Sequence, residues 1–361
     1  KNSLNYYFYL LKIEKEVIIL VTLNEIAKKA QISKTTVSRV LNEDQTLSVT
    51  EETRKKILQA AEELDYIPKK QRNIEKKITN PKQYGKIGLL MYLSQESEFD
   101  DPYFLAIRNG IEKRMIELGI ELSKVLRPPF NKKDLEGLDG LIVVGVIGQE
   151  EVENQVKQVQ HLVFVDVSPD EQLYDSVVID SEKATEKVIQ YLLDLGHKKI
   201  GYIGGQSYTI GGLSGKLEIH DVRKRTYEKM LTELGLYNPE YTYIGKWTTK
   251  DGLTLMEEAI HSGNLPTAFF IGSDPMAIGA LKALTDSGLK VPDDIAIFGF
   301  DGIELCEFVT PPLSTVKVHT EEMGKVAVNL LVERIDGRTL PLKVVVPTSL
   351  IIRKSCGGEG I

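Results

Sequence analysis

The side chains that most often carry enzymatic chemistry fall in no catalytic or metal-binding pattern in this 361-residue chain. Cys306 and Cys356 are far apart in the sequence, which fits a reducing compartment better than a disulfide framework. The glycine pairs at 204–205 and 211–212 are not followed by the Gly-Lys-Ser/Thr of a phosphate-binding loop. The histidines show neither metal-ligand spacing nor a nucleophile partner: His161, His197, His220, His261 and His319. We therefore expect no metal, no cofactor and no enzymatic activity.

Charge is distributed unevenly along the chain. The whole sequence has a net charge of −7, but residues 22–82 contain 13 Lys and Arg against 9 Asp and Glu, a net charge of +4. Residues 83–361 contain 29 basic against 41 acidic side chains, a net charge of −12. Attraction to phosphates depends on charge within a Debye length and not on the total for the chain. The N-terminal segment is therefore compatible with a nucleic-acid partner.

Residues 22–66 show the spacing of three short helices. Thr22 followed by Glu25 is a capping box, which predicts that a helix begins there. Ser33 can cap a second helix over 34–41, and Thr50 a third that extends to Leu64, with apolar residues at helical spacing in each. Residues 67–85 are basic with few apolar side chains, and they predict a linker without a core of its own.

The elements that follow residue 86 are predicted to form a large α/β unit. Apolar runs alternate with amphipathic stretches, a pattern that indicates parallel sheets covered on both faces. About 275 residues are too many for one sheet, so we expect two doubly wound lobes. Ligands of such folds bind at the carboxyl ends of the strands. The predicted strands are 87–93, 140–146, 162–167, 199–204, 268–272, 295–300 and 344–347.

Long motifs connect this organisation to a known family. Residues 21–30, 33–42, 49–54 and 64–68 resemble the headpiece of the lactose/galactose (LacI/GalR-type) repressor family. The core is similar to that family through Phe164-Val165-Asp166, Ser273-Asp274, Phe300-Asp301 and Pro311-Pro312-Leu313. A finer similarity to repressors of galactose and β-galactosidase operons is carried by Asp101-Pro102-Tyr103, Asn109-Gly110-Ile111-Glu112 and Asp221-Val222-Arg223.

The resemblance covers about residues 21–355 and implies a complete domain plan. A small all-α helix-turn-helix headpiece (22–66) precedes a hinge linker (67–85) and a two-lobed ligand-binding core (86–355) of the type I periplasmic-binding-protein kind. Lobe 1 comprises about 86–178 and 319–347, and lobe 2 about 179–316 and 348–355. The N-terminal extension (1–21) has no assigned role, because charged residues interrupt its apolar run too early for a membrane span and no export cleavage site follows. Residues 356–361 are expected to form a flexible tail.

The resemblance also implies which side chains contact DNA. The second helix of a helix-turn-helix lies in the major groove, where Lys34, Thr35 and, one turn later, Arg39 would meet base edges. Further contacts are expected from Thr22, Thr36, Ser38, Asn42 and Tyr66. The helix pattern alone also allows a plain helical bundle with a solvated basic face. Gln31 stands where the family usually has glycine, so a left-handed turn there would cost about 1 kcal/mol.

The linker departs from the family pattern. Relatives order this segment into a hinge helix that wedges a leucine into the minor groove. Ile74 is the corresponding candidate here, one residue displaced and next to Glu75, whose charge would be unfavourable near phosphates. A simple basic tether remains the alternative.

A sugar presents pairs of hydroxyls and aliphatic faces, and a matching site needs carboxylates, a guanidinium and an aromatic platform. The resemblance assigns these roles to Tyr103, Asp166, Arg223, Trp247, Ser273 and Asp301. Each also has a structural alternative: a turn cap for the aspartates, a solvated face for Arg223 and ordinary packing for Trp247. Ser273 replaces the asparagine that is common in relatives, which changes the expected hydrogen bonds.

Together these features predict a cytoplasmic homodimer that represses a galactose or galactoside operon by binding a palindromic DNA operator. A sugar would release it, and no membrane partner is expected. Two alternatives remain open from the sequence: a regulator that uses its sugar as a corepressor, and a sugar receptor without DNA regulation. Paired acids would also suit a glycosidase, but sugar binding needs the same acids and an N-terminal DNA module gives hydrolysis no evident purpose. No heptad-rich tail follows Arg353, so a tetramer of the lactose-repressor kind is not expected.

Overall fold

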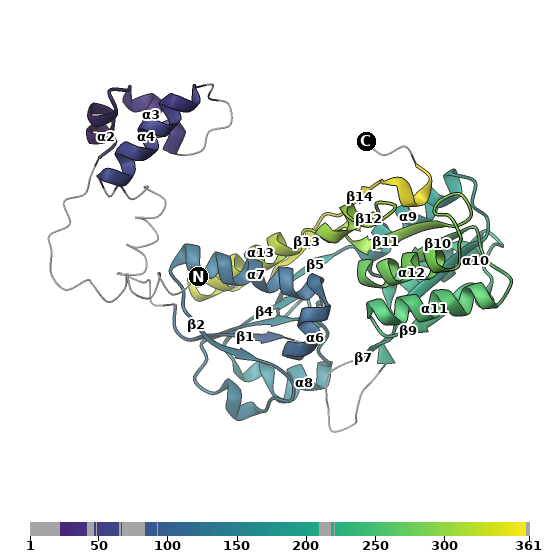
Figure 1. Ribbon diagram of the computed structural model, residues 1–361. Helices are drawn as coiled ribbons and strands as arrows, with labels where there is room; N and C mark the ends of the chain where they lie inside the picture. The colour runs from purple at the N-terminus through teal and green to yellow at the C-terminus, as the bar shows by residue number, and fades with distance from the viewer. Residues whose placement is uncertain are drawn as a thin grey trace. The chain divides into compact units, whose positions relative to one another are not determined.

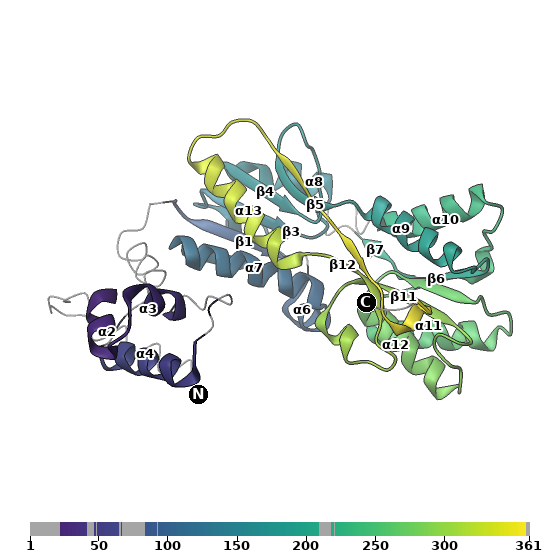
Figure 2. The same ribbon diagram turned by 90° about the horizontal axis from the view of Figure 1, so that it is seen from above.

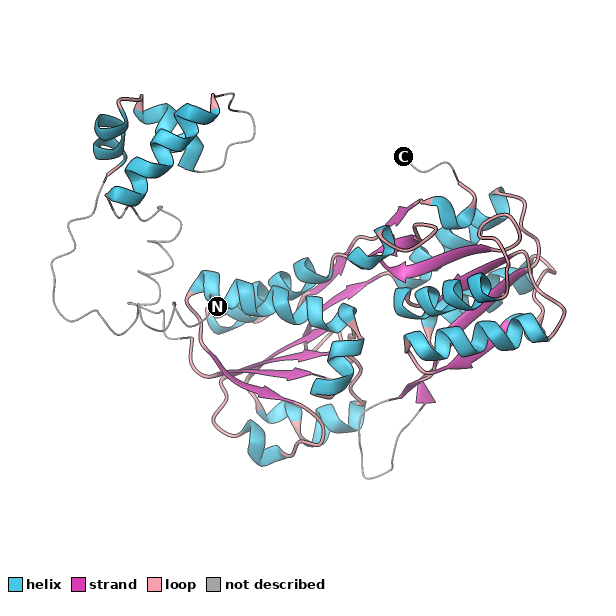
Figure 3. Cartoon of the chain, viewed as in Figure 1, coloured by secondary structure: helices cyan, strands magenta, loops and turns pink. Residues whose placement is uncertain are grey.

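A computed structural model describes residues 22–41, 47, 49–64, 66, 84–91, 93–208, 218–219 and 221–358 (Figure 1). The N-terminal extension, most of the linker, Asn42 and Ile74 lie outside these residues. The chain divides into a helical N-terminal unit and a larger α/β unit that begins at Lys82. Figure 3 distinguishes the helices and strands of each unit. None of the helices among the described residues is long and apolar enough to cross a membrane.

The N-terminal unit consists of α2 (Leu23–Ala30), α3 (Lys34–Leu41) and α4 (Glu51–Glu63). The predicted capping box is confirmed, because the Thr22 side chain accepts from the Glu25 backbone and Glu25 in turn accepts from the backbone N–H of Thr22. Ser33 and Thr50 cap α3 and α4 through their hydroxyl groups, as expected. Ile26, Val37 and Ile57 are fully buried where the three helices meet. Each helix thus begins at a local polar signal and is held by one apolar face.

Gln31 ends α2 in the left-handed conformation, with φ 56° and ψ 38°. A side chain with a Cβ atom is strained there, whereas glycine adopts these angles freely. We expect Gln31→Gly to raise the free energy of unfolding of the N-terminal unit by about 1 kcal/mol. The measurement is native-state hydrogen exchange of the amides in 22–41. Slower exchange in that segment, with unchanged exchange in the α/β unit, is the expected result, and faster exchange would contradict it.

Lobe 1 of the α/β unit contains a six-stranded sheet in the order β13-β5-β4-β3-β1-β2. Every neighbouring pair in it is parallel. The central strands are almost fully buried, as expected for a sheet covered on both faces. The strands are β1 (Ile87–Met91), β2 (Leu122–Leu126), β3 (Gly140–Val144), β4 (His161–Val165), β5 (Asp175–Ile179) and β13 (Lys343–Val346).

Lobe 2 contains a second six-stranded sheet, with the strand order β14-β12-β11-β10-β6-β9. Its pairs are parallel except that β14 runs antiparallel to β12. A small hairpin of β7 (Ser207–Tyr208) and β8 (Glu218–Ile219) follows β6. The sheet strands are β6 (Ile200–Gly205), β9 (Thr242–Gly245), β10 (Ala268–Ile271), β11 (Ala296–Asp301), β12 (Ser314–Lys317) and β14 (Ser349–Ile351).

Helices cover both faces of each sheet (Figures 1 and 2). In lobe 1, α7 (Pro102–Leu118) packs against α13 (Thr320–Ile335), and α6 (Gln95–Asp100) precedes α7 while α8 (Gln149–Asn154) follows β3. In lobe 2, α9 (Ser181–Asp194) packs against α10 (Val222–Glu233), and α11 (Thr249–His261) against α12 (Asp274–Asp286). A Cβ at Gly110 would lie 2.2 Å from the Glu321 carbonyl oxygen. Glycine therefore permits the close crossing of α7 and α13.

The chain passes between the lobes after β5, after β12 and between β13 and β14, the last crossing being visible in Figure 2. The predicted fold class, a helix-turn-helix unit followed by two doubly wound lobes, is confirmed. The expected flexible tail is wrong at its first residue. Cys356 is fully buried at the end of a short 3₁₀ helix, Lys354–Cys356, where Ser314 contacts its sulfur atom at 3.0 Å.

Candidate functional site

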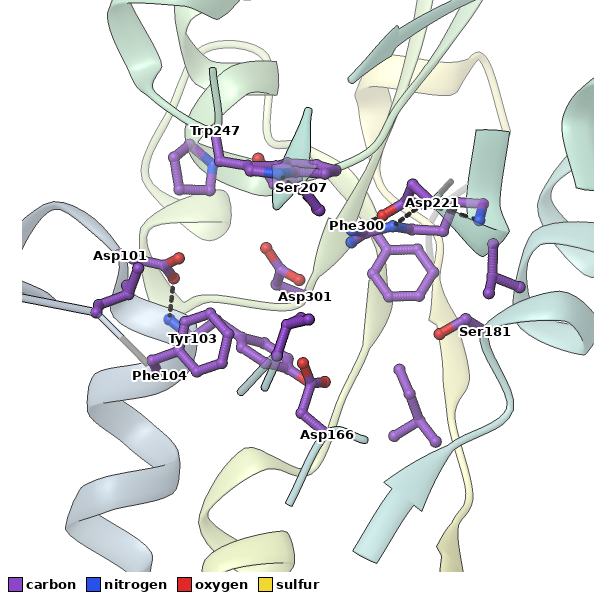
Figure 4. Close-up of a pocket in the computed structure, with 17 residues that line it drawn as sticks. Asp101, Tyr103, Phe104, Asp166, Ser181, Ser207, Asp221, Trp247, Phe300 and Asp301 are labelled. Atoms are coloured by element: carbon purple, nitrogen blue, oxygen red, sulfur yellow. Dashed lines mark hydrogen bonds and ion pairs between the residues drawn. The ribbon is translucent and has the colours of Figure 1, made fainter. Parts of the chain in front are cut away.

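A cavity of about 260 Å³ lies between the two lobes of the α/β unit. Side chains from both lobes surround it (Figure 4). The structure brings together all of the residues that the sequence suggested for a ligand: Tyr103, Asp166, Arg223, Trp247, Ser273 and Asp301.

The strand ends explain why these residues meet. Asp166 follows β4, Ser273 lies two residues after β10, and Asp301 is the last residue of β11. Trp247 comes two residues after β9. The carboxyl ends of parallel strands share one edge of a sheet, and the edges of the two lobes face one another across the cavity.

Arg223 is fixed in one orientation by its neighbours. Its Nε and Nη2 atoms donate to the two carboxylate oxygens of Asp221 at 2.9 and 2.6 Å, and Nη1 donates to the Gly272 carbonyl oxygen at 2.7 Å. Of the five N–H groups of a guanidinium, these bonds leave one on each terminal nitrogen. That remaining pair is suited to two adjacent hydroxyls of a ligand.

Trp247 forms a flat wall of the cavity, lying above the space between Asp101, Asp301 and Asp166 in Figure 4. Its Nε1 atom donates to the Ser207 hydroxyl at 3.1 Å, and the Arg223 guanidinium carbon lies 4.5 Å from the ring centroid. The ring also packs on Gly205, where a Cβ would approach Trp247 to 2.4 Å. These contacts hold the aromatic surface in place without a ligand.

Tyr103 and Asp166 form the opposite wall, which belongs to lobe 1. The Tyr103 hydroxyl donates to Asp166 at 2.7 Å. Asp101 caps α7 by accepting from the Tyr103 backbone N–H at 3.1 Å. The backbone of Asp166 has a φ of 77°, in the left-handed region that non-glycine residues seldom adopt. Strain of this kind is often found at ligand-binding positions.

Asp301 is held in place by a second, fully buried carboxylate, that of Asp274. Asp274 accepts from the backbone N–H groups of Gly302 and Ile303 at 2.6 and 3.0 Å, and from the Thr315 hydroxyl at 2.7 Å. These bonds fix the turn after β11, where Asp301 has a φ of 118°. Asp274 is therefore a positioning residue for the carboxylate that lines the cavity.

Ser273 presents a polar atom without a hydrogen-bond partner among the residues that the structure describes. Its hydroxyl group is buried and neither donates nor accepts a hydrogen bond there. Ser273 is the N-cap residue of α12, but its side chain does not cap that helix. A buried hydroxyl in this state favours a ligand or a water molecule as partner.

The helix-turn-helix surface of the N-terminal unit is the second candidate site. Lys34 and Thr35 are exposed in the first turn of α3, as expected for contacts with base edges. Arg39, one turn later, and Ser38 are half-buried. Thr22 and Thr36 bond to Glu25 and Ser33, and the Tyr66 backbone N–H bonds to Ala61.

The family of this chain follows from its similarity to known proteins. Residues 22–69 match the model of the bacterial regulatory proteins of the lacI family, and residues 189–356 match that of the periplasmic binding protein-like domain. The chain is 46% identical over 344 residues to the HTH-type transcriptional repressor MelR of Bacillus subtilis (strain 168), covering 94% of this chain and 98% of that protein. The chain belongs to the LacI family of bacterial regulatory proteins. Members of the LacI family are DNA-binding transcriptional regulators, not enzymes.

Other LacI-family members align over nearly the whole chain. The HTH-type transcriptional regulator GalR of Streptococcus thermophilus is 38% identical, covering 93% of this chain and 99% of that protein. A transcriptional regulator CelR–cellobiose complex superposes with a TM-score of 0.65 at 26% identity, and a Lac repressor dimer bound to operator and the anti-inducer ONPF with 0.64 at 26%. Each alignment includes 93% of this chain and 99% of the solved chain. The two-lobed core of the periplasmic-binding-protein kind is thereby confirmed.

Burial sets the protonation of the carboxylates in this LacI-family cavity. Burial raises the pKa of Asp101 to about 6, and a smaller part comes from the charge of Asp166. It also raises the pKa of Asp166 and, together with the charge of Asp274, that of Asp301 well above its usual value. Burial opposes the charge of Arg223, but Asp221 outweighs it and raises the pKa of the guanidinium. Arg223 is thus charged throughout the physiological range.

The raised pKa of Asp101 predicts a pH-dependent stability. A carboxyl whose pKa is higher in the folded protein stabilises it below the unfolded value near 4, and this stabilisation is lost as pH rises through about 6. Asp101→Asn keeps the helix cap but cannot ionise. We expect the free energy of unfolding of the variant to exceed that of wild type by about 1 kcal/mol at pH 4.5 and by up to about 3 kcal/mol at pH 8. Urea unfolding followed by Trp247 fluorescence measures this difference, and an equal difference at both pH values would contradict it.

Several residues of the cavity were not predicted from the sequence. Asp101 and Asp221 line the cavity and occur in motifs that indicate the family, but those motifs assign them no role in the site, and Ser207 has no local signal. Asp274, which supports Asp301 from behind the cavity, also occurs in such a motif without an assigned role. Asp221 could have been recognised because it caps α10 two residues before Arg223. Asp274 and Ser207 are identified only by their tertiary partners.

Proposed function

We propose that this chain represses an operon for the use of a sugar of the galactose or galactoside class, and that the sugar releases it from its operator. The observation that carries this proposal is the cavity. It offers a fixed guanidinium with two remaining donors, carboxylate acceptors and an aromatic wall, which together complement ring hydroxyls and a C–H face. Tyr103, Asp166, Arg223, Trp247, Ser273 and Asp301 are the proposed sugar contacts.

Operator recognition is assigned to α3 of the N-terminal unit. Lys34 and Thr35 are proposed to meet base edges, with Arg39 one turn along the same helix. Thr22, Thr36, Ser38, Asn42 and Tyr66 are proposed to fix the register on phosphates, and Ile74 to contact the minor groove. The protein then acts in the compartment that contains the DNA, the cytoplasm.

We further propose a homodimer, because a palindromic operator requires two headpieces related by a two-fold axis. Lobe 2 displays an exposed apolar pair next to the 3₁₀ helix Glu304–Glu307: Phe308 is 70% exposed and Leu305 52%. Exposed aromatic and aliphatic side chains of this kind are enriched at protein interfaces. This pair is the proposed contact between the two copies.

Phe308→Glu is therefore expected to convert the dimer to monomers and to weaken operator binding by at least 100-fold, because each headpiece would bind its half-site separately. Sedimentation velocity and DNA binding measure the two effects. The control is Leu234→Glu, which changes a 55% exposed leucine elsewhere in lobe 2 and should alter neither. A dimeric Phe308→Glu variant would contradict the assignment of the interface.

The coupling between sugar and DNA follows from the position of the cavity. A sugar that contacts Tyr103 and Asp166 in lobe 1 and Arg223 in lobe 2 favours one arrangement of the lobes. In a dimer, such a change alters the spacing of the headpieces. By linkage, a sugar that weakens operator binding binds less tightly to the operator-bound form.

A regulator that uses its sugar as a corepressor has the same headpiece and cavity, but the sugar strengthens operator binding instead of weakening it. A sugar receptor without DNA regulation uses only the two-lobed core. DNase footprinting on the DNA upstream of this gene and its neighbours separates them. Protection of a two-fold symmetric site that galactose or a galactoside removes supports the repressor. Protection that appears only with sugar supports the corepressor, and the absence of protection under both conditions supports the receptor.

A further inference from the structure

The ionisable side chains of the cavity are strongly unbalanced. Among the described residues, four carboxyl groups and one guanidinium line it, with no lysine or histidine. Arg223 offsets only part of the excess: its charge lowers the pKa of the other three carboxyl groups, but its guanidinium is hydrogen-bonded to Asp221. Within the part of the chain that the structure describes, three carboxyl groups face the cavity without forming an ion pair: Asp101, Asp166 and Asp301.

The helix N-termini at the cavity are occupied by the protein's own carboxylates. An N-terminus ordinarily attracts anions such as phosphate, because its N–H groups are free and its dipole is positive. Here Asp101 accepts from the first turn of α7 and Asp221 from that of α10, at 3.1 and 2.8 Å. Asp301 accepts from the Asp274 N–H at the start of α12, at 3.4 Å. An anionic ligand finds these positions filled.

The carboxylates also do not form a cation site. No group of three or more His, Cys, Asp or Glu side chains in the described part of the chain is arranged to hold a metal ion. Their bonds instead go to Tyr103 and to backbone N–H groups, so the oxygen atoms that remain point toward the cavity as acceptors. A hydroxyl can donate to these oxygens, whereas a phosphate or carboxylate group brings a like charge to those that are ionised. Asp101, with a pKa of about 6, is ionised at pH 7.5.

We infer that the cavity accepts an uncharged sugar and rejects the same sugar once it carries a phosphate or a carboxylate group. The inference rests on the proposed function, in which the cavity binds a sugar. If so, the sugar that binds the cavity is formed before any step that phosphorylates it. Uptake without phosphorylation, or hydrolysis of a glycoside, supplies this sugar. A phosphorylating reaction then consumes it.

Calorimetric titration of the full-length chain at pH 7.5 without DNA tests this inference. The probes are galactose, galactose 6-phosphate, galacturonic acid and galacturonamide, the last being a neutral molecule of the same shape as the acid. We expect galacturonamide to bind within tenfold of galactose. The acid is expected to bind at least 100-fold more weakly than its amide, and galactose 6-phosphate at least 100-fold more weakly than galactose.

Equal binding of the acid and the amide would overturn the inference, and so would rejection of both while galactose binds, since size and not charge would then decide. Failure of galactose and lactose alike would instead overturn the proposed sugar-binding function. Two variants refine the test. Asp101→Asn removes one charge from the cavity. It should reduce the factor by which galacturonamide binds more tightly than galacturonic acid by at least fivefold. Asp286→Asn, at the exposed far end of α12, should leave the ratio unchanged.

Discussion

Arg223→Lys is expected to reduce sugar affinity by at least 100-fold while operator affinity stays within threefold of wild type. Lysine keeps the positive charge beside Asp221 but lacks the planar fork that presents two parallel donors. Loss of two hydrogen bonds from a charged group corresponds to about 3 kcal/mol or more. The variant would thus stay on its operator at sugar concentrations that release wild type.

Calorimetry with galactose or a galactoside, together with operator binding, measures both quantities. Arg225→Lys is the matched control, because Arg225 lies two residues along the same helix but is exposed and does not line the cavity. The control should bind sugar and DNA as wild type does. Normal sugar affinity in Arg223→Lys would remove Arg223 from the site.

Lys34→Ala is expected to weaken operator binding by about 100-fold in the dimer, since each of two half-sites loses a contact worth 1–3 kcal/mol. Sugar affinity should not change, because Lys34 belongs to the N-terminal unit. The matched control is Lys56→Ala, which removes an exposed lysine of α4 that pairs with Glu52. Fluorescence anisotropy at fixed salt, with operator and scrambled duplexes, measures the effect.

A contact with bases and a contact with phosphates differ in this experiment. If Lys34 reads a base, the variant loses affinity for the operator more than for scrambled DNA. If Lys34 contacts only phosphate, both affinities fall by the same factor. Unchanged operator affinity would contradict the assignment of α3 as the recognition helix.

Much of the fold was predictable because its signals are local. The capping box at Thr22 and Glu25 involves residues three positions apart, and the buried strands β1, β3 and β10 are continuous apolar runs. Gln31 likewise adopts the left-handed turn that its position between two helices requires.

Other strands lack such a signal. The edge strand β2 is mostly exposed, and β9 and β14 are short and mixed in polarity. The strand β5 begins with Asp175, which is fully buried and is stabilised by ion pairs with Arg334 and Arg338 at 3.1 and 2.8 Å. Those partners are more than 150 positions away, so no local pattern reveals them.

The candidate site also has residues that the sequence predicts and residues that only the tertiary structure reveals. The cavity residues that recur in family motifs, such as Asp166 and Arg223, were predicted, and the structure brings them together. Their supports were not, because Asp274 and Ser207 act through contacts that exist only in the folded lobes. The charge balance of the cavity also depends on which carboxylates face it, and that is a property of the tertiary structure.

Repression that a sugar relieves is tested most directly by fluorescence anisotropy of the full-length protein on labelled DNA from upstream of its gene, at fixed physiological salt. Titrations would be made with and without galactose, lactose and allolactose, against a scrambled duplex. A sugar-released repressor binds one natural sequence tightly, and at least one of these sugars relieves that binding. Equal affinity for natural and scrambled DNA under every condition would contradict this repressor function.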